Sequence, residues 1–334
     1  MKSSLVEVKL HGYLKDDIPN DHRKQLYKLL REFELETSKY PTTIAFVRDT
    51  FESTLPEEIK EYWVLVFQED ELIGYGYCDW QIKFDNFDNG SIRLFVKKEH
   101  RRKNIASNMI RLLLANTDEQ VRIFNIMAYE GTVGEIYLRN LQGKLVFTEK
   151  MIVSNTNDFS VEEINNLVSS FEEKAQNNGF RIEFLSQTKL LALTDNSHFV
   201  KMIERNWNAM PNEDQSLEDT VITPERLRES FDYRIKRGDE YFTVLATHKD
   251  SKKFAGYTMT RVNKNMPEVG IQHDTGVLSE YRGNRLGLTM KYKLLQHLKN
   301  NTSVIYWETG SAASNIYMER INVSFTTSFH FNVI

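Results

Sequence analysis

The chain contains an internal repeat. The segment 94–114 (LFVKKEHRRKNIASNMIRLLL) aligns without a gap with the segment 275–295 (TGVLSEYRGNRLGLTMKYKLL), 181 positions later. Several positions are identical, among them Val96 with Val277 and Arg101 with Arg282. Repeats in solenoid proteins have far shorter periods, so this spacing indicates a duplicated domain. The length of 334 residues suits two domains of ordinary size.

The flanks of the repeat predict the architecture of each half. VLVFQEDELIGYGY (64–77) resembles TVLATHKDSKKFAGYTM (243–259), and both predict two strands around a charged turn. VRIFNIMA (121–128) and SVIYWET (303–309) predict buried strands after the repeated segments. We therefore predict an α/β fold, in which each half is a mixed, mostly antiparallel sheet flanked by helices.

The join between the halves is predicted around a helix. DFSVEEINNLVSSFEEKAQNNG (158–179) has a start signal at Ser160 and an end signal at Asn177-Asn178-Gly179. We expect an N-terminal domain over 1–153, a linker helix within 154–180 and a C-terminal domain over 181–334.

The second copy of the repeat carries the sequence Arg282-Gly283-Asn284-Arg285 immediately before a helical pattern. In that helix Leu288, Tyr292 and Leu295 form one apolar line, and Lys291 and Lys293 are predicted to fall between or opposite the apolar lines. The start of a helix offers unpaired N–H groups that suit phosphate, and ligands bind open α/β sheets at the carboxyl edge of the strands. A plain surface turn carrying arginines is the alternative.

Composition narrows the function classes. The net charge of −4 argues against a protein committed to nucleic acid, although KKEHRRK (97–103) is a local basic cluster. One cysteine, Cys78, excludes an intramolecular disulfide and fits a reducing cytoplasm. No run of about 18 apolar residues predicts a membrane span, the N-terminus lacks a signal-peptide core, and no metal-ligand spacing appears. We expect a cytoplasmic protein without metal.

The two turns resemble the signature of the GNAT superfamily of acyl-CoA-dependent N-acyltransferases, Arg/Gln-x-x-Gly-x-Gly/Ala between the fourth strand and the next helix. Arg282 to Gly287 fits with Arg285 in place of the middle glycine, and Arg101 to Ala106 fits with Asn104 there. Because asparagine tolerates a left-handed backbone better than arginine, we expect the second turn to differ slightly from the first. The resemblance spans nearly the whole chain and is to proteins with two such domains in tandem.

The resemblance implies a site for acetyl-CoA in the second half. Arg282 and Arg285 would bond phosphate oxygens, the strand edge at Val277-Leu278 would pair with the pantetheine arm and polarise the thioester carbonyl, and Asn315 would bond the arm or the strand. The backbone N–H groups that would cradle the pyrophosphate are those of Gly283, Asn284, Arg285, Leu286, Gly287 and Leu288. The first half, with EGTVGEIYLRNLQG (130–143) in place of the Asn315 segment, would be a degenerate copy.

The sequence offers fewer candidates for the catalytic acid and base than for the acetyl-CoA site. His273 and Asp274 precede the cofactor site on a predicted strand, where alternation would direct them to opposite faces, and ordinary polar residues of a sheet are the alternative. The carboxylate of Ile334 is a further candidate. Many GNAT enzymes have a tyrosine acid seven residues after the asparagine, but this chain has Asn322 there, which leaves Tyr317 as the candidate acid.

The sequence thus predicts transfer of an acetyl group from acetyl-CoA to a primary amine of a small molecule by direct attack. A non-catalytic acyl-CoA sensor is the alternative, and a nucleic-acid or protein-associated module using residues 97–103 is a weaker one. The identity of the amine, the acyl-chain preference and any homo-oligomer are not encoded in a readable pattern.

Overall fold

The structure, a computed structural model, describes residues 8–37, 40, 42–325 and 329–333. The chain forms two compact units, Met1–Ala128 and Tyr129–Ile334. Ile334, proposed above as a source of a carboxylate, lies outside the described residues. No described helix is both long enough and apolar enough to cross a membrane.

The first unit is built on a five-stranded sheet of order β1-β2-β3-β4-β5. Neighbouring strands are antiparallel except β4 and β5, which are parallel. Helices α1 and α2 cover one face and α3 covers the other, each over its own apolar core. The strands are β1 (Val8–Leu14), β2 (Ile59–Gln68), β3 (Glu71–Gln81), β4 (Asn89–Val96) and β5 (Ile123–Ile126), and the helices are η1 (Lys15–Asp17), α1 (Asn20–Thr37), α2 (Ile44–Glu52), η2 (Lys98–His100) and α3 (Ile105–Ala115).

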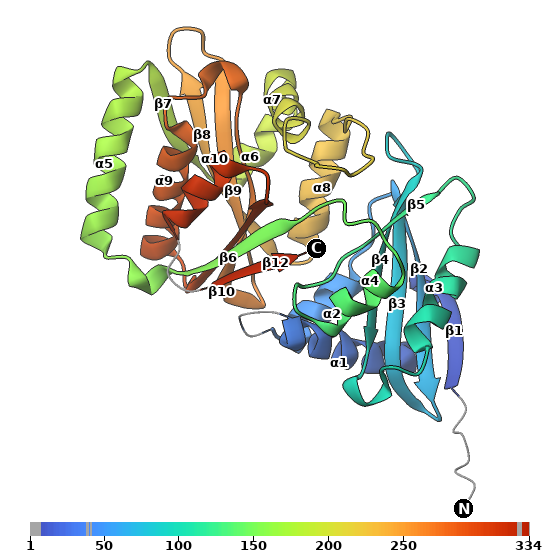
Figure 1. Ribbon diagram of the computed structural model, residues 1–334. Coiled ribbons are helices and arrows are strands. Elements are labelled where there is room, and N and C mark those ends of the chain that lie inside the picture. The colour runs from blue at the N-terminus through green and yellow to red at the C-terminus, as the bar shows by residue number, and fades with distance from the viewer. Residues whose placement is uncertain (1–7, 38–39, 41, 326–328, 334) are drawn as a thin grey trace, which may run out of the picture. The chain divides into compact units, whose positions relative to one another are not determined.

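The second unit is built on a seven-stranded sheet of order β12-β6-β11-β10-β9-β8-β7 (Figure 1). Its strands are β6 (Glu149–Asn155), β7 (Phe180–Leu185), β8 (Asp239–His248), β9 (Phe254–Asn263), β10 (Met266–Val277), β11 (Tyr306–Ala312) and β12 (Phe329–Val333). Its helices are α4 (Val133–Asn140), η3 (Thr156–Asp158), α5 (Val161–Asn177), α6 (Gln187–Leu193), α7 (Ser197–Trp207), α8 (Pro224–Lys236), η4 (Ser279–Tyr281), α9 (Leu286–Asn301) and α10 (Ile316–Val323).

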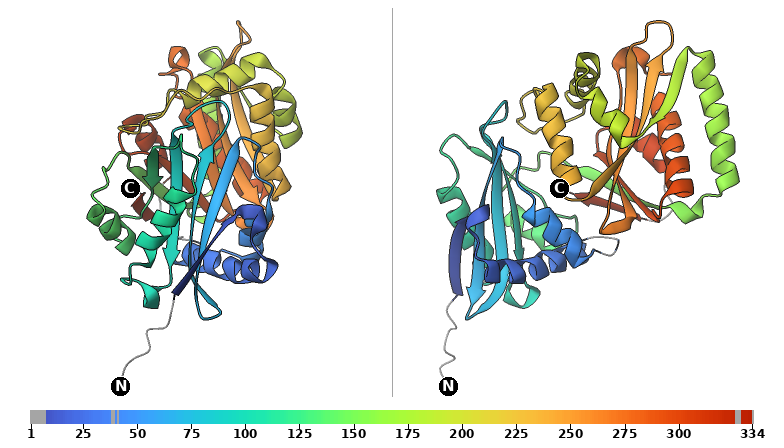
Figure 2. Two further views of the ribbon diagram at one scale, coloured as in Figure 1. Left: turned by 90° about the vertical axis from the view of Figure 1, so that its right-hand side faces the viewer. Right: turned by 180° about the vertical axis from the view of Figure 1, so that it is seen from behind.

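Two layers of helices enclose this sheet. Helices α5 and α9 lie together on one face, as Figure 1 and the reversed view in Figure 2 both show, and they pack on β8 and β9 through side chains such as Val168, Val244 and Met290. Helices α6 to α8 cover the other face over Phe199, Tyr241 and their neighbours. The predicted α/β class and the mostly antiparallel sheets in both halves are confirmed.

The boundary between the units differs from the predicted one. Strand β6, placed by the sequence at the end of the first domain, pairs with both β11 and β12 and so belongs to the second sheet. Helix α5 begins after Ser160, whose hydroxyl accepts from the Glu163 N–H, and ends at Asn177 as predicted. It does not act as a linker, because Ile164, Val168 and Ala175 are buried in the core beneath α9.

The parting of β10 and β11 positions the site. These parallel strands pair only over Val269–Ile271 and 306–308, after which β10 continues to Val277 with one edge unpaired by β11. A β-bulge interrupts the pairing of β10 with β9 between Gln272 and Asp274. Helix α7 approaches β10 closely at Gly276, where an added Cβ would meet the Asn206 Cγ at 2.6 Å. The second sheet is therefore open on one side of β10 and covered tightly across its α7 face.

Candidate functional site

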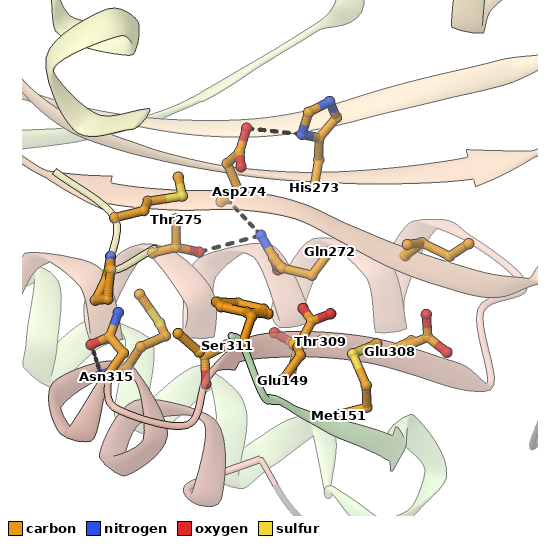
Figure 3. A pocket seen from close by; sticks show the side chains of 17 residues that line it. Glu149, Met151, Gln272, His273, Asp274, Thr275, Glu308, Thr309, Ser311 and Asn315 are labelled. Atoms are coloured by element: carbon orange, nitrogen blue, oxygen red, sulfur yellow. Dashed lines mark hydrogen bonds and ion pairs between the residues drawn. The ribbon is translucent and has the colours of Figure 1, made fainter. Parts of the chain in front are cut away.

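A pocket of about 330 Å³ lies where β10 and β11 part (Figure 3). Three strands and the start of α10 provide its walls, and three carboxylates, a histidine and three methionines are among the lining side chains. The lining residues are Phe147, Glu149, Met151, Met210, Pro211, Ile271, Gln272, His273, Asp274, Thr275, Glu308, Thr309, Gly310, Ser311, Ala312, Asn315 and Met318. The combination of acidic and flexible apolar walls suits an organic cation.

His273 and Asp274 lie on the same face of β10, so the prediction of opposite faces is wrong. The bulge at these residues adds one residue to β10 relative to β9 and breaks the alternation. The His273 Nδ1 lies 2.8 Å from the Asp274 Oδ2. A dashed line marks this contact in Figure 3. Trp207 of α7 donates its indole N–H to the same oxygen at 3.0 Å.

The Asp274 carboxylate is held in its charged form. Burial raises its pKa, but the neighbouring His273, the hydrogen bonds from His273 and Trp207, and Arg234 outweigh burial and leave the pKa below its usual value. An ionised carboxylate only accepts hydrogen bonds, so the proton of this contact sits on the His273 Nδ1. The Nε2 of a neutral His273 then keeps the lone pair that a general base needs.

The turn before α9 has the shape of an anion cradle. Gly283 has φ of 86° and Arg285, the N-cap of α9, is left-handed with φ of 55° and ψ of 20°. The turn of the first unit repeats this geometry, with φ of 62° at Arg102 and 59° at Asn104. The expectation that the second turn would differ because of Arg285 is therefore wrong. Alternating left-handed residues at a helix start direct successive N–H groups toward one point.

The two turns differ in the charges around them. Arg282 donates its Nε to the Val277 carbonyl at 3.1 Å, and Arg101 makes the equivalent bond to Val96 at 2.8 Å. Arg101 also pairs with Glu36 at 2.7 Å, and Lys97 pairs with Glu71. Within the described part of the chain, Arg282 and Arg285 make no ion pair and both side chains are exposed. The arginine of the signature is therefore available to a phosphate in the second turn and paired with a carboxylate in the first. Arg102 and Lys103, exposed and outside the ion pairs of the described residues, keep the first turn basic as well.

Val277 and Leu278 have different roles from each other. The Leu278 N–H donates to the Ala255 carbonyl of β9 at 2.9 Å. It is therefore not available to a ligand, and the prediction that Leu278 pairs with the pantetheine arm through this group is wrong. Because N–H groups alternate between the two edges of a strand, the Val277 N–H faces the edge that β11 leaves open. The carbonyl of Val277, which the Arg282 side chain bonds, faces the same edge.

The start of α10 carries two residues predicted to act at the site, Asn315 and Tyr317, and only Asn315 lines the pocket. Asn315 lines the pocket, and its Oδ1 caps the helix by accepting from the Met318 N–H at 3.1 Å, which leaves its amide N–H₂ for other partners. Tyr317 is 74% exposed, while the neighbouring Met318 faces the pocket. The structure therefore gives no support to Tyr317 as the acid.

Comparison with known proteins identifies the family to which the chain belongs. The profile of the Acetyltransferase (GNAT) family matches residues 23–128 and 202–320, more than half of the chain. The chain belongs to the GNAT acetyltransferase family. The two matched regions fall in the two repeats, so this is a tandem GNAT protein.

Solved structures share the fold over the whole length. A tandem GNAT protein from the clavulanic acid biosynthesis pathway has a TM-score of 0.69 at 13% identity, with 98% of each chain covered. A GCN5-related N-acetyltransferase from Sphaerobacter thermophilus has a TM-score of 0.62 at 12% identity, covering 98% of this chain and 94% of that one. No curated protein matches the sequence significantly. At sequence identities of 12 and 13%, this similarity shows that the fold is shared and does not show that the substrate is shared.

The first GNAT unit has no counterpart of the His273–Asp274 pair at the aligned positions. The register of the repeat places Arg93 at the position of Asp274 and Ile92 at that of His273. The charge is thus reversed where the second unit carries a carboxylate. In the described ranges, no three side chains of histidine, cysteine, aspartate or glutamate gather in a group that could hold a metal ion.

Sequence reasoning missed Lys291, the most unusual residue near this pocket. It was predicted to lie between or opposite the apolar lines of its helix, but its side chain is 0% exposed in the core of the second unit. Its Nζ donates to the Asn322 Oδ1 at 2.7 Å and to the Thr309 Oγ1 at 3.1 Å. Burial lowers the pKa of Lys291 to about 7. A hint was available, because Lys291 follows Gly287 by four residues and so shares its face of the helix.

Replacing Lys291 with methionine should change how stability depends on pH. The unfolded lysine has a pKa of about 10.4, whereas the folded value is about 7. Between these values the unfolded state binds more protons, so this residue makes the free energy of unfolding of the wild type rise by about 1.4 kcal/mol per pH unit. Below the folded pKa, Lys291 is charged in both states, and the full cost of burying the ammonium group lowers the free energy of unfolding.

The measurement is urea unfolding of wild type and Lys291→Met at a series of pH values from about 6 to about 9. We expect the stability of the variant relative to wild type to be greatest at the acidic end and to shrink as pH rises above about 7. A difference that stays constant over this range would contradict the assignment of a lowered pKa.

Proposed function

We propose that the second unit transfers an acetyl group from acetyl-CoA to a primary amine of a small molecule. The supporting observation is one continuous path along β10. The cradle before α9 adjoins the open edge of β10, since the Arg282 Nε donates to the Val277 carbonyl at that edge at 3.1 Å. The first turn of α9 packs on the adjoining face of β10, where an added Cβ on Gly287 would lie 3.9 Å from side-chain atoms of Thr275 and Val277. Thr275 in turn lines the pocket that contains Asp274 and His273.

The residues fit acetyl-CoA as a substrate. Arg282, Arg285 and the N–H groups at the start of α9 would hold the pyrophosphate, and acetyl-CoA supplies an acyl group activated as a thioester. The N–H of Val277 would donate to the thioester oxygen and stabilise the negative charge that develops there. The open edge of β10 would hold the extended arm of the substrate as it would hold an added strand.

The amine would be prepared by the acid–base pair. An alkylammonium ion cannot attack a carbonyl carbon until it has lost a proton, and the His273 Nε2 would accept that proton. The resulting imidazolium lies beside the Asp274 carboxylate, which stabilises it. The deprotonated nitrogen then bonds to the acyl carbon, and the carbon–sulfur bond breaks with its electron pair left on sulfur. The nitrogen loses a second proton to water in this step, which gives the neutral amide.

The pocket favours an amine that arrives as a cation. Glu149 and Glu308 line it on the β6 and β11 side. Burial raises the pKa of Glu149 and so disfavours its charged form, which leaves Glu308 as the main source of negative charge on this side. Glu308→Gln should raise KM for a cationic amine by about 3- to 30-fold with little change in kcat, because the lost charge acts on binding. Steady-state kinetics at low and high salt would check this, and an unchanged KM at low salt would count against Glu308.

A second candidate function is non-catalytic binding of acyl-CoA. It is favoured by Asn322, since the position where the family resemblance implies a tyrosine acid carries an amide bonded to Lys291. The cradle and the open strand edge would serve binding alone equally well.

One experiment distinguishes the two functions. Wild type is incubated with acetyl-CoA and a panel of diamines, amino sugars and amino acids, and the released thiol and the acetylated product are measured. Cys78, the one cysteine, is buried and so adds little to the thiol signal. Turnover of any amine supports the transferase. Acetyl-CoA binding by calorimetry without turnover on the panel supports the sensor, and absence of binding would exclude both.

A further inference from the structure

The proposed acetyl transfer assigns no role to the buried side chain of Lys291. Its ammonium group lies between α9, β11 and α10, over the rings of Trp307 at 5.2 Å and Phe325 at 5.5 Å. Two neutral oxygens accept from it, one on Thr309 and one on Asn322. A methionine would fill the same volume without a buried amine, so the lysine costs stability that packing alone does not require.

No described acidic side chain neutralises this lysine. On β11, Glu308 adjoins Thr309 but points to the opposite face, since strand side chains alternate. The charged groups on the other elements around α9 are engaged elsewhere: Glu172 of α5 with Lys293, Glu183 of β7 with Arg181, Asp239 of β8 with Arg261 of β9, Asp274 of β10 with His273, and Glu319 of α10 with Lys150. Lys291 is therefore free to gain and lose a proton without breaking an ion pair.

Thr309 connects Lys291 to the pocket. It lines the pocket just beyond the last paired residues of β10 and β11, and Figure 3 shows it facing the space that Gln272 and Thr275 border from the other strand. A threonine hydroxyl can accept one hydrogen bond while it donates another. The Lys291 Nζ provides the donor, so the hydroxyl proton of Thr309 is available to an acceptor in the pocket.

We propose that Lys291, through the hydroxyl of Thr309, supplies the proton that the sulfur of CoA takes up when the carbon–sulfur bond breaks. This inference rests on the proposed acetyl transfer. The sulfur retains the bonding electron pair and forms an S–H bond with the Thr309 proton, and Thr309 takes a proton from the ammonium group of Lys291. Lys291 becomes a neutral amine and is recharged by solvent protons after the products leave. The substrate nitrogen loses two protons to solvent, the first through His273 and the second as the tetrahedral adduct collapses to the neutral amide.

In this scheme Thr309 touches the reacting sulfur and Lys291 is a positioning residue that acts through it. The site also defines the ligand chemistry, because a neutral hydroxyl backed by a cation stabilises a thiolate. The Gln272 side chain is not a competing donor to the pocket, since its amide bonds the Met259 and Asp274 carbonyls at 2.6 and 2.7 Å.

The test compares wild type with Lys291→Met, Thr309→Val and Thr309→Ser. In wild type, kcat should fall as pH rises above about 7, because the proton donor must be charged to act. In Lys291→Met and Thr309→Val this fall should be absent, and kcat at about neutral pH should be lower by roughly 10- to 100-fold. Thr309→Ser keeps the hydroxyl, so it should retain the pH dependence and have a kcat closer to that of wild type than Thr309→Val has. Acetyl-CoA affinity by calorimetry should differ from that of wild type by less than about 3-fold in all three variants if the fold is intact.

A second measurement requires no turnover. The thiol of bound CoA is titrated by the ultraviolet absorbance of its thiolate, and its pKa should be lower in wild type than in Lys291→Met. Equal thiol pKa values, or the same pH profile of kcat in both proteins, would overturn the inference and leave the transferase in place. Failure of wild type to bind CoA would instead remove the proposed function and this inference together.

Discussion

Gly287→Phe is expected to weaken acetyl-CoA binding by more than about 100-fold, because a displaced first turn of α9 no longer presents the N–H groups that would hold the pyrophosphate. Gly287 is the second residue of α9, and a side chain there points toward Thr275, Val277 and Ile321. A phenyl ring would collide with these side chains, because Gly287 is buried, and would force the first turn of α9 and its N–H groups away from β10. Isothermal titration calorimetry measures the loss directly, and circular dichroism reports whether the fold persists.

Two matched variants make this result interpretable. Gly287→Ala adds a Cβ that lies 3.2 Å from the Ile321 Cδ1, a terminal methyl able to move, so its binding should stay within about 3-fold of wild type. Ala106→Phe makes the equivalent change in the first unit, at the position that the repeat aligns with Gly287. Loss of binding in Ala106→Phe alone would assign the substrate to the first unit.

The sequence allowed the repeat, the strand pairs and the position of the cradle to be predicted, because each depends on local pattern. The apolar runs on either side of a charged turn can form few structures other than the β2–β3 and β8–β9 hairpins. The capped helix at 161–177 was equally local. The packing of this helix beneath α9 could not be predicted from local pattern. The same holds for the sheet that β6 joins, since the sequence of an apolar strand does not specify which strands it pairs with.

The site depended on features without a sequence signature. The bulge that brings His273 beside Asp274 is one extra residue in β10, and no glycine marks it. Lys291 is buried because α9 covers the sheet over more than one helical face, whereas an amphipathic pattern assigns lysines to solvent. Arg285 in a left-handed conformation violates the local preference that was used to predict a different turn. Departures of this kind at one end of one strand are typical of functional sites.

Asp274→Asn should lower kcat/KM for the amine by on the order of 10²-fold, the lower part of the range for general-base catalysis. The amide oxygen can still accept from Trp207 and from the His273 Nδ1, which lie 3.0 and 2.8 Å from the present carboxylate oxygen. The change therefore preserves shape and hydrogen bonds and removes only the negative charge. Without that charge, the imidazolium that forms on proton transfer loses its stabilising neighbour, so the loss should fall on kcat rather than on binding.

His273→Gln distinguishes this role from a structural one. Glutamine can keep a polar contact with Asp274 but cannot accept a proton, so His273→Gln and the double variant with Asp274→Asn should be slow to the same extent. Two residues that act as one base give non-additive losses, whereas two independent polar contacts give losses that multiply. Multiplying losses, or a wild-type rate in Asp274→Asn with acetyl-CoA affinity unchanged, would remove this pair from the chemistry. The base would then have to be sought among Glu149 and Glu308, the other carboxylates that line the pocket.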